Sequence, residues 1–361
     1  MRAVAHATSF SAAPRGASAR AGDARRAVAA WLFACCALVF AMVVVGGVTR
    51  LTHSGLSIVE WQPIVGTLPP LDDAEWQATF DKYKLTPEYR LVNAGMSLDE
   101  FKGIFWWEYF HRLLGRLIGV AFLLPFLGFL LRRRIPEGYG WPLACIFALG
   151  GLQGAMGWYM VASGLVEDPR VSPLRLTAHL GLALLIFAAM LWVAMSLLRP
   201  DRVRRDDEGT RSARRWSAGT ALLVFAMALS GGLVAGIRAG FAYNTFPLMN
   251  GSIVPPEIMM LEPWWRNFVW NMATVQFDHR LGAWLLAFAV PVTWWKLRHA
   301  RLGAHVSRAG ALTLAMLAVQ IGLGIATLLY VVPLSLAALH QAGAVILLAL
   351  ALNAAHVTRR S

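Results

Sequence analysis

Charged residues are scarce in this chain of 361 residues: they make up 15% of it, whereas 57% of the residues are hydrophobic. Acidic residues are the scarcer kind, with 20 Asp and Glu against 33 Lys and Arg, so the net charge is +13. The mean hydropathy is +0.54. This composition excludes an ordinary soluble domain and predicts an all-α protein that crosses a membrane several times.

Cysteine is also rare, and the positions of the three cysteines exclude a disulfide framework. Cys35, Cys36 and Cys145 all fall within apolar stretches rather than in the loops that an oxidising compartment would reach. We therefore interpret them as small buried residues and expect no disulfide bond.

Eight apolar stretches are long enough to cross a bilayer. They cover residues 28–48, 105–131, 140–162, 173–198, 214–236, 272–295, 308–330 and 334–357. Residues 1–27 precede them as a basic tail that we expect to be disordered. Its richness in Ala, Arg and Ser is typical both of a mitochondrial presequence and of a bacterial cytoplasmic tail, and both interpretations stay open.

The distribution of charge predicts the orientation. With the N-terminus inside, the inner segments and their flanks hold 21 of the 33 basic residues but only 6 of the 20 acidic ones. This is the bias expected of inner loops, so we place both termini inside. Clusters of arginine beside helices favour contact with anionic membrane lipids, and we expect no nucleic acid to bind.

The chain is internally duplicated, because landmarks of its first four predicted helices recur in order in the last four. The recurring landmarks are Gly46-Gly47 with Gly231-Gly232, Gln153 with Gln320, and Gly157 with Gly324. An even number of helices per repeat gives both halves one orientation. We therefore predict two tandem four-helix bundles, residues 28–198 and 214–357, related by a pseudo-twofold axis and joined by a basic inner linker over residues 199–213.

The two predicted outer loops differ in length. The first runs over about residues 49–104, whereas its counterpart covers about residues 237–271. The longer loop contains two segments, Asp72–Lys84 and Ser97–Gly103, that we expect to be amphipathic and to lie over the outer face.

Four histidines occupy repeat-equivalent positions in the outer third of predicted helices: His111 and His179 in the first half, His279 and His340 in the second. An interhelical hydrogen bond would explain a single membrane histidine. Two opposed pairs instead favour haem iron, which paired imidazoles in a helix bundle suit. A zinc site is not expected, since neither pair has a third or fourth ligand.

Three neighbouring residues add to this pattern. Arg112 and Arg280 follow their histidines directly, where each suits either a haem propionate or a lipid headgroup. Glu108 lies one helical turn before His111, whereas Gln276 holds the equivalent place before His279. This asymmetry favours proton transfer or charge stabilisation in the first half, although a carboxylate at a helix start also suits the helix dipole.

Several longer motifs resemble the haem A synthase family in its alphaproteobacterial and mitochondrial branch, which is called cysteine-free because it lacks a cysteine pair in the first outer loop. They are Gly46-Gly47-Val48-Thr49-Arg50-Leu51-Thr52, Ser54-Gly55-Leu56-Ser57, Glu60-Trp61-Gln62-Pro63, Asn93-Ala94-Gly95-Met96-Ser97 and the run Phe101 to Gly115. The likeness covers nearly everything after residue 28. It implies a membrane oxidoreductase that oxidises the C8 methyl of haem O to a formyl group, by two hydroxylations and a dehydration, for terminal oxidase biogenesis.

The resemblance also implies a division of labour between the histidine pairs. His279 and His340 would be the axial iron ligands of a permanent haem b, and His111 and His179 would bracket the substrate haem. Glu108 would take part in catalysis, either by stabilising a cationic intermediate or by deprotonating the attacking water.

The expected partners are haem O, the farnesyltransferase that makes haem O, an electron acceptor of unspecified kind and, as an alternative to a monomer, further copies of the chain. The expected location is the cell inner membrane, or the mitochondrial inner membrane in a eukaryote. Two other functions compete: a di-haem membrane cytochrome of the quinol oxidoreductase type that only carries electrons, and a secondary transporter. The di-haem cytochrome would use all four histidines equally and would not need Glu108. Transporters usually have broken helices and charged pairs at the midplane, whereas the polar residues here cluster near the outer surface.

Overall fold

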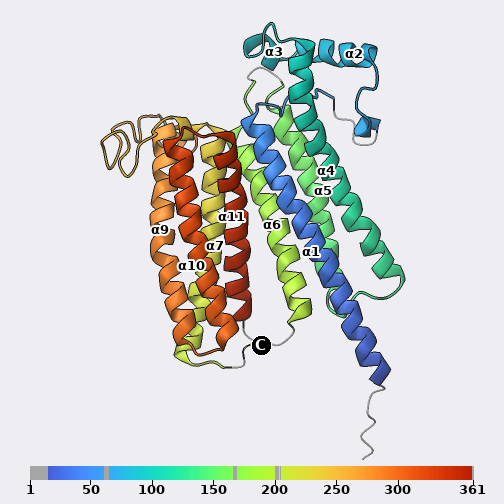
Figure 1. The fold of residues 1–361 in the computed structure, drawn as a ribbon, viewed down its shortest axis with the longest axis vertical. Helices are drawn as coiled ribbons and strands as arrows, with labels where there is room; N and C mark the ends of the chain where they lie inside the picture. Colours follow the sequence, from blue (N-terminus) through green and yellow to red (C-terminus); the bar gives the residue numbers. More distant parts are fainter. Residues whose placement is uncertain (1–14, 61–64, 166–168, 200–202, 204, 360–361) are drawn as a thin grey trace, which may run out of the picture.

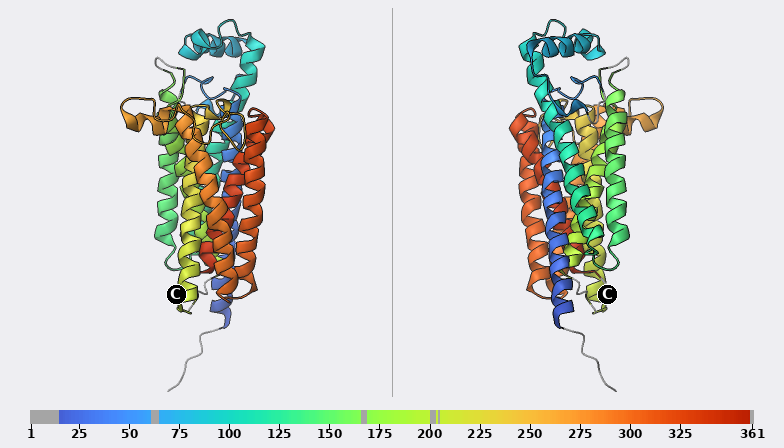
Figure 2. Two further views of the ribbon diagram at one scale, coloured as in Figure 1. Left: turned by 90° about the vertical axis from the view of Figure 1, so that its left-hand side faces the viewer. Right: turned by 90° about the vertical axis from the view of Figure 1, so that its right-hand side faces the viewer.

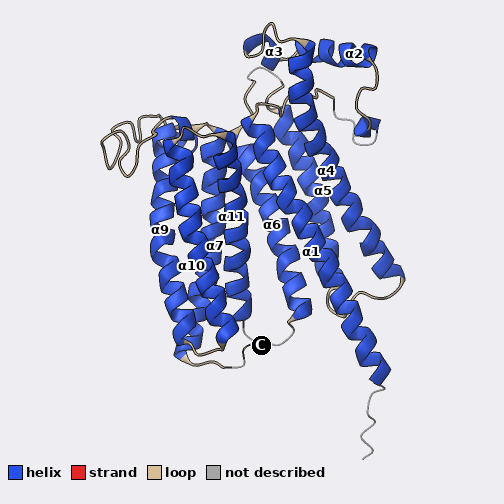
Figure 3. Cartoon of the chain, in the orientation of Figure 1, coloured by secondary structure: helices blue, strands red, loops and turns tan. Residues whose placement is uncertain are grey.

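The computed structural model describes residues 15–60, 65–165, 169–199, 203 and 205–359. Within these ranges the chain is helical (Figure 3), and the bridge between Met249 and Ser252 is isolated rather than part of a strand. Eight of the described helices are long: α1 (Arg15–Leu51), α4 (Leu98–Leu131), α5 (Gly140–Ala162), α6 (Pro173–Leu198), α7 (Glu208–Gly236), α9 (Met272–His299), α10 (Ala304–Leu329) and α11 (Leu334–Val357). The prediction of an all-helical polytopic membrane protein is confirmed.

Seven of the eight long helices are long and apolar enough to cross a membrane. The eighth, α9, has 28 residues but begins with a polar stretch that contains Gln276, Asp278 and Arg280. It packs along α7 and α10 like a member of the bundle. The number of helices that cross the bilayer, and the placement of both termini inside, stay predictions.

The long helices form two groups of four that lie side by side (Figure 1). One group contains α1, α4, α5 and α6, and the other contains α7, α9, α10 and α11. The groups meet through α6 with α7 and through α11 with α1 and α6. The packing thus follows the duplication in the sequence, and α1 begins at the same end of the molecule at which α11 ends.

The two groups differ in how tightly their helices pack. In the second group α9 and α10 are in contact along much of their length, whereas the equivalent helices of the first group, α4 and α5, make few contacts. Only Leu143 and Ile146 of α5 are buried, and past Tyr109 only Phe122 of α4 is buried. The first half is therefore open along this seam.

A small cap stands on the first group, beyond the ends of the long helices (Figure 2). It consists of α2 (Asp73–Lys84) and α3 (Pro87–Leu91), preceded by a short 3-10 turn, η1 (Val65–Thr67). Aromatic residues of α2 and of the first turns of α4 form its core, among them Trp76, Phe80 and Phe101. We call this end of the molecule the cap end.

The corresponding segment of the second group is less regular. It contains two 3-10 turns, η2 (Ala239–Phe241) and η3 (Trp264–Arg266), and the short helix α8 (Asn267–Trp270). The side chain of Asn271 then caps α9 by accepting from the backbone N–H groups of Ala273 and Thr274.

Two predictions about boundaries are wrong. Residues 15–27, assigned to the disordered tail, are the first turns of α1, while residues 1–14 lie outside the described residues. Ser97–Gly103 is not a separate segment over the face, because Ser97 is the N-cap of α4 and forms a capping box with Glu100. The other predicted segment, Asp72–Lys84, is present as α2 with Asp72 as its N-cap.

Candidate functional site

Each of the four predicted histidines lies against a glycine of the preceding long helix. A Cβ atom on Gly46 would lie 3.1 Å from Nε2 of His111, and one on Gly157 would lie 3.1 Å from Cε1 of His179. In the second half, a Cβ atom would lie 3.4 Å from His279 at Gly231 and 2.9 Å from His340 at Gly324. These separations are tight for a Cβ atom, so the four glycines let the helices approach and hold the rings.

The two histidines of the second half face each other. The ring centroids of His279 and His340 are 6.5 Å apart, and their planes are inclined by 78°. With metal–nitrogen bonds of about 2 Å, two imidazoles on opposite sides of one metal atom have centroids about 6 Å apart. In the first half, His111 and His179 lie within electrostatic reach of each other.

Two glutamines hold one histidine of each pair. Nε2 of Gln320 donates to the carbonyl of His340 at 2.8 Å and lies 3.1 Å from its Nδ1. Nε2 of Gln153 lies 3.2 Å from both the carbonyl and Nδ1 of His179. Such contacts fix the orientation of a ligating imidazole.

The remaining two histidines differ in their partners. Oγ of Ser230, which directly precedes Gly231 in α7, lies 3.2 Å from Nδ1 of His279. The repeat-equivalent position beside His111 is Val45, which has no polar side chain. His279 is thus oriented by a hydroxyl, whereas His111 is held by packing.

The donor set fits a haem better than an isolated metal ion. Within the described residues, no group of three or more His, Cys, Asp and Glu side chains comes together as a metal cluster needs. Each half instead offers two imidazoles, with a glycine beside each ring. In addition, Oε1 of Gln153 and of Gln320 is buried and has no hydrogen-bond partner in the described part of the chain.

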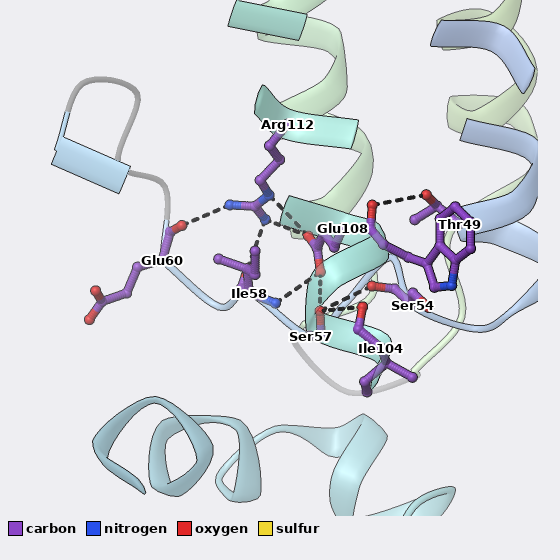
Figure 4. A network of polar contacts seen from close by, with 9 residues as sticks. Thr49, Ser54, Ser57, Ile58, Glu60, Ile104, Glu108 and Arg112 are labelled. Atoms are coloured by element: carbon purple, nitrogen blue, oxygen red, sulfur yellow. Dashed lines mark hydrogen bonds and ion pairs between the residues drawn. The ribbon is translucent and has the colours of Figure 1, made fainter. Parts of the chain in front are cut away.

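Glu108 lies at the centre of a hydrogen-bond network in the first half (Figure 4). The residue is 2% exposed. Its Oε1 accepts from Nε and Nη2 of Arg112 at 3.0 and 2.7 Å, and its Oε2 accepts from Oγ of Ser57 at 2.7 Å and from the backbone N–H of Ile58 at 2.9 Å. Both carboxylate oxygens therefore accept two hydrogen bonds each.

Arg112 also fixes the loop that follows α1. Its Nη1 donates to the carbonyl of Glu60 at 2.9 Å and its Nη2 to the carbonyl of Ile58 at 2.7 Å. The Glu60 side chain in turn pairs with Lys82 of α2 at 2.7 Å. One guanidinium thus joins Glu108 to the loop and, through Glu60, to the cap. Trp61, Gln62 and Pro63 of the sequence motif lie outside the described residues.

The second half repeats this arrangement without the charge. Nη2 of Arg280 donates to Oε1 of Gln276 at 3.0 Å and to the carbonyl of Tyr243 at 2.9 Å. Nε2 of Gln276 donates to the carbonyl of Ala239 at 2.7 Å. Nε of Arg280 is buried and has no partner in the described residues, whereas Nε of Arg112 is occupied by Glu108. The predicted propionate contacts stay predictions, but both arginines also hold loops.

A second buried carboxylate, Glu88 of α3, lies within the cap. It is 6% exposed and its Oε2 accepts from the hydroxyl of Tyr83 at 3.4 Å. Burial, and next the negative charge of Glu108, raise the pKa of Glu88 to about 7. This carboxyl therefore changes charge near neutral pH.

The sequence predicts the histidines and Glu108 as site residues but does not predict the side chains that contact them. It points to no role for Ser57 or Ser230, and Gln153 and Gln320 stand out in it only as landmarks of the repeat. The recurrence of Gln and Gly four residues apart, on helices next to a histidine, is a signal that identifies two of these supports. The approach of Ser57 to Glu108 depends on the path of a loop, which no repeat pattern records.

Comparisons with known proteins are consistent across nearly the whole chain. A family model described as "Cytochrome oxidase assembly protein" matches residues 29–352. A protein named "Heme A synthase" from Nitrosospira multiformis is 62% identical over 336 residues, which are 93% of this chain and 94% of that protein. Proteins of the same name from Nitrosomonas eutropha and Paramagnetospirillum magneticum are 58% identical over 326 residues and 52% identical over 343 residues. These alignments cover 90% and 94% of this chain, and 92% and 96% of the respective relatives.

Proposed function

Because the chain belongs to the haem A synthase family of cytochrome oxidase assembly proteins, we propose that it oxidises the C8 methyl group of haem O to the formyl group of haem A. The methyl is hydroxylated twice, each hydroxylation removing two electrons that an electron acceptor takes up, and the resulting geminal diol loses water to leave the formyl group. The observation that carries the assignment is the contrast between the two halves: a buried carboxylate, Glu108, stands one turn before His111, and a neutral amide, Gln276, stands one turn before His279.

Family membership implies a haem-related cofactor, and we propose that it is haem b in the second half. His279 and His340 would bind its iron, Ser230 and Gln320 would orient the two rings, and Arg280 keeps a buried Nε–H for a propionate. A bound haem b supplies an iron that takes up and releases one electron at a time.

We place the substrate haem between His111 and His179 in the first half. His111 belongs to α4, and Gln153 and Gly157 of α5 lie against His179, so the seam between α4 and α5 runs beside this pair. A substrate has to enter and its product has to leave, which suits the more open half.

Glu108 acts in this proposal as a fixed negative charge rather than as a mobile base. Its oxygens already accept four hydrogen bonds, so the carboxylate can take a proton only after one donor has been released. A carboxylate held in this way stabilises positive charge that develops at the substrate methyl. Ser57 and Arg112 are positioning residues for it.

The same family assignment supports a role in cytochrome oxidase biogenesis in the cell inner membrane. The enzyme would receive haem O from the farnesyltransferase that makes it and pass electrons to an acceptor. The enzyme would work either as a monomer or as a homo-oligomer.

The test is to express the chain with and without co-produced haem O, extract the haems and separate them. Haem A together with haem b supports the proposal. Haem b alone, unchanged by haem O, would favour the electron-carrying di-haem cytochrome. Replacing His279 or His340 by Ala should deplete haem b, whereas His111→Ala or His179→Ala should spare haem b and lose haem A. Equal loss of haem b from all four variants would contradict the division of labour.

A further inference from the structure

Two contacts join repeat-equivalent residues at the cap end, where the halves meet. When the matched glycines of α1 and α7 are aligned, His53 corresponds to Arg238 and Arg50 corresponds to Ala235. Nη2 of Arg238 donates to Nδ1 of His53 at 2.8 Å. Nη2 of Arg50 donates to the carbonyls of Gly236 at 3.1 Å and Ala235 at 3.4 Å. A residue that contacts its own equivalent lies close to the pseudo-twofold axis, so these basic side chains gather there.

The cluster lies between the two histidine sites. Arg50 follows Gly46 by four residues on α1, so it lies on the same helical face, one turn nearer the cap end. Gly46 contacts the ring of His111. On α7, Gly231 lies against His279, and the residue four positions later is Ala235, whose carbonyl accepts a hydrogen bond from Arg50.

Arg50 has a hydrogen-bond donor that the described part of the chain does not satisfy. Its Nε is buried and has no partner there. Arg238 and His53 are the basic groups around it, and Glu88 is the acidic group whose charge reaches it. A buried donor without an acceptor is unfavourable, and a carboxylate is the acceptor that matches the guanidinium fork.

We propose that Arg50 and Arg238 bind a carboxylate on the axis between the halves, and that this carboxylate is a haem propionate. A haem bound at either histidine pair can supply the propionate, because the cluster lies one helical turn from each of the two sites. The inference rests on the proposed function, since it requires a haem in at least one half. It assigns the axis a role in binding as well as in joining the two bundles.

The test is a redox titration of the purified holoprotein, prepared once with haem b alone and once from cells that also make haem O. Arg50→Gln and Arg238→Gln each remove a positive charge beside a propionate, which favours the ferric iron and lowers the midpoint potential. Arg50→Lys keeps the charge and should keep the potential near that of the wild type. Arg266→Gln is the matched control, because Arg266 is exposed at the same end.

The haem whose potential falls identifies the source of the propionate: haem b for the second half, the substrate haem for the first. Unchanged potentials in both Arg50→Gln and Arg238→Gln, or an equal fall in Arg266→Gln, would overturn the inference. If Arg50→Gln does not fold, Arg238→Gln decides, because Arg238 is exposed and lies outside the helices. A wild-type protein without haem would instead refute the proposed function.

Discussion

Glu108 and Gln276 occupy equivalent places in the two halves, and each accepts a hydrogen bond from the arginine four residues further along its helix. The distances are 2.7 Å to Arg112 and 3.0 Å to Arg280. Both residues are buried, with exposed fractions of 2% and 3%. Because a carboxylate and an amide have nearly the same shape, the two sites differ here by one negative charge, and the two residues form a matched pair for mutation.

Glu108→Gln should lower the yield of haem A at least about tenfold and leave the haem b content unchanged, because the variant keeps the shape of the side chain and loses its charge. Extraction and chromatographic separation of the haems measure both quantities. Gln276→Glu is the control and should not create a second site of oxidation. Normal haem A production by Glu108→Gln would contradict the catalytic role.

Gly324→Ala should weaken the retention of haem b about tenfold, an effect typical of changes that disturb the orientation of a metal-binding histidine. The added Cβ atom would lie 2.9 Å from Cε1 of His340, so the ring has to move. The ratio of haem b to purified protein measures this. Gly322→Ala, on the same helix, is the control, because no atom lies within 4 Å of a Cβ atom placed there. Equal haem b in both variants would show that the glycine does not hold the ring.

The equivalent change in the first half, Gly157→Ala, should affect the substrate site alone. Its Cβ atom would lie 3.1 Å from His179, so haem O and haem A should decrease in the purified protein while haem b stays constant. Gly154→Ala serves as the control on α5, since no atom lies within 4 Å of its added Cβ atom. A loss of haem b from Gly157→Ala would argue against separate sites.

Gln320→Leu should reduce the affinity for haem b by about tenfold to a hundredfold, the usual effect of removing a group that orients a metal-binding histidine. The variant loses the hydrogen bond to the His340 carbonyl and the contact with its Nδ1. Transfer of haem to an acceptor protein measures the affinity. Gln153→Leu makes the same change beside His179 and should leave haem b in place.

The stability of the cap should depend on pH through Glu88. Its pKa rises from 4.5 in the unfolded chain to about 7 in the folded protein, chiefly because the carboxyl is buried. The folded state thus binds the proton more tightly. The stabilisation that this provides is complete below the lower pKa and is lost as the pH rises through the higher one.

The melting temperature of the purified protein should therefore fall between about pH 5 and pH 8, and Glu88→Gln should flatten this dependence. Glu137→Gln is the control and should behave like the wild type, because Glu137 is exposed in the loop between α4 and α5, at the end of the molecule opposite the cap. A profile for Glu88→Gln as steep as that of the wild type would assign the pH dependence to another group.

Sequence patterns predicted the helices best where an apolar stretch and the helix end together. The stretches 140–162, 173–198 and 334–357 have the bounds of α5, α6 and α11. Prediction failed where polar residues extend a helix beyond the apolar stretch, as at the start of α1 and at Ser97, the N-cap of α4. Hydropathy measures the length of the apolar part, whereas caps and local hydrogen bonds determine where the helix begins.

The candidate site shows the same limit. The four histidines could be predicted because the duplication repeats their positions, and the roles proposed for them follow from that pattern. The partners of Arg112 and Arg280 could not, because these guanidinium groups bind backbone carbonyls of loops such as those of Ile58 and Tyr243. Every residue has a backbone carbonyl, so the sequence does not show which ones accept hydrogen bonds. The position of each carbonyl depends on the whole path of the loop.

The unequal packing of the two bundles has a kinetic consequence. Parting α4 from α5 breaks few contacts, whereas parting α9 from α10 breaks an extended interface. We therefore expect a lower activation free energy for opening in the first half, and opening rates depend exponentially on that quantity. We therefore expect the proposed substrate compartment of the first half to exchange its contents more often than the proposed haem b compartment of the second half.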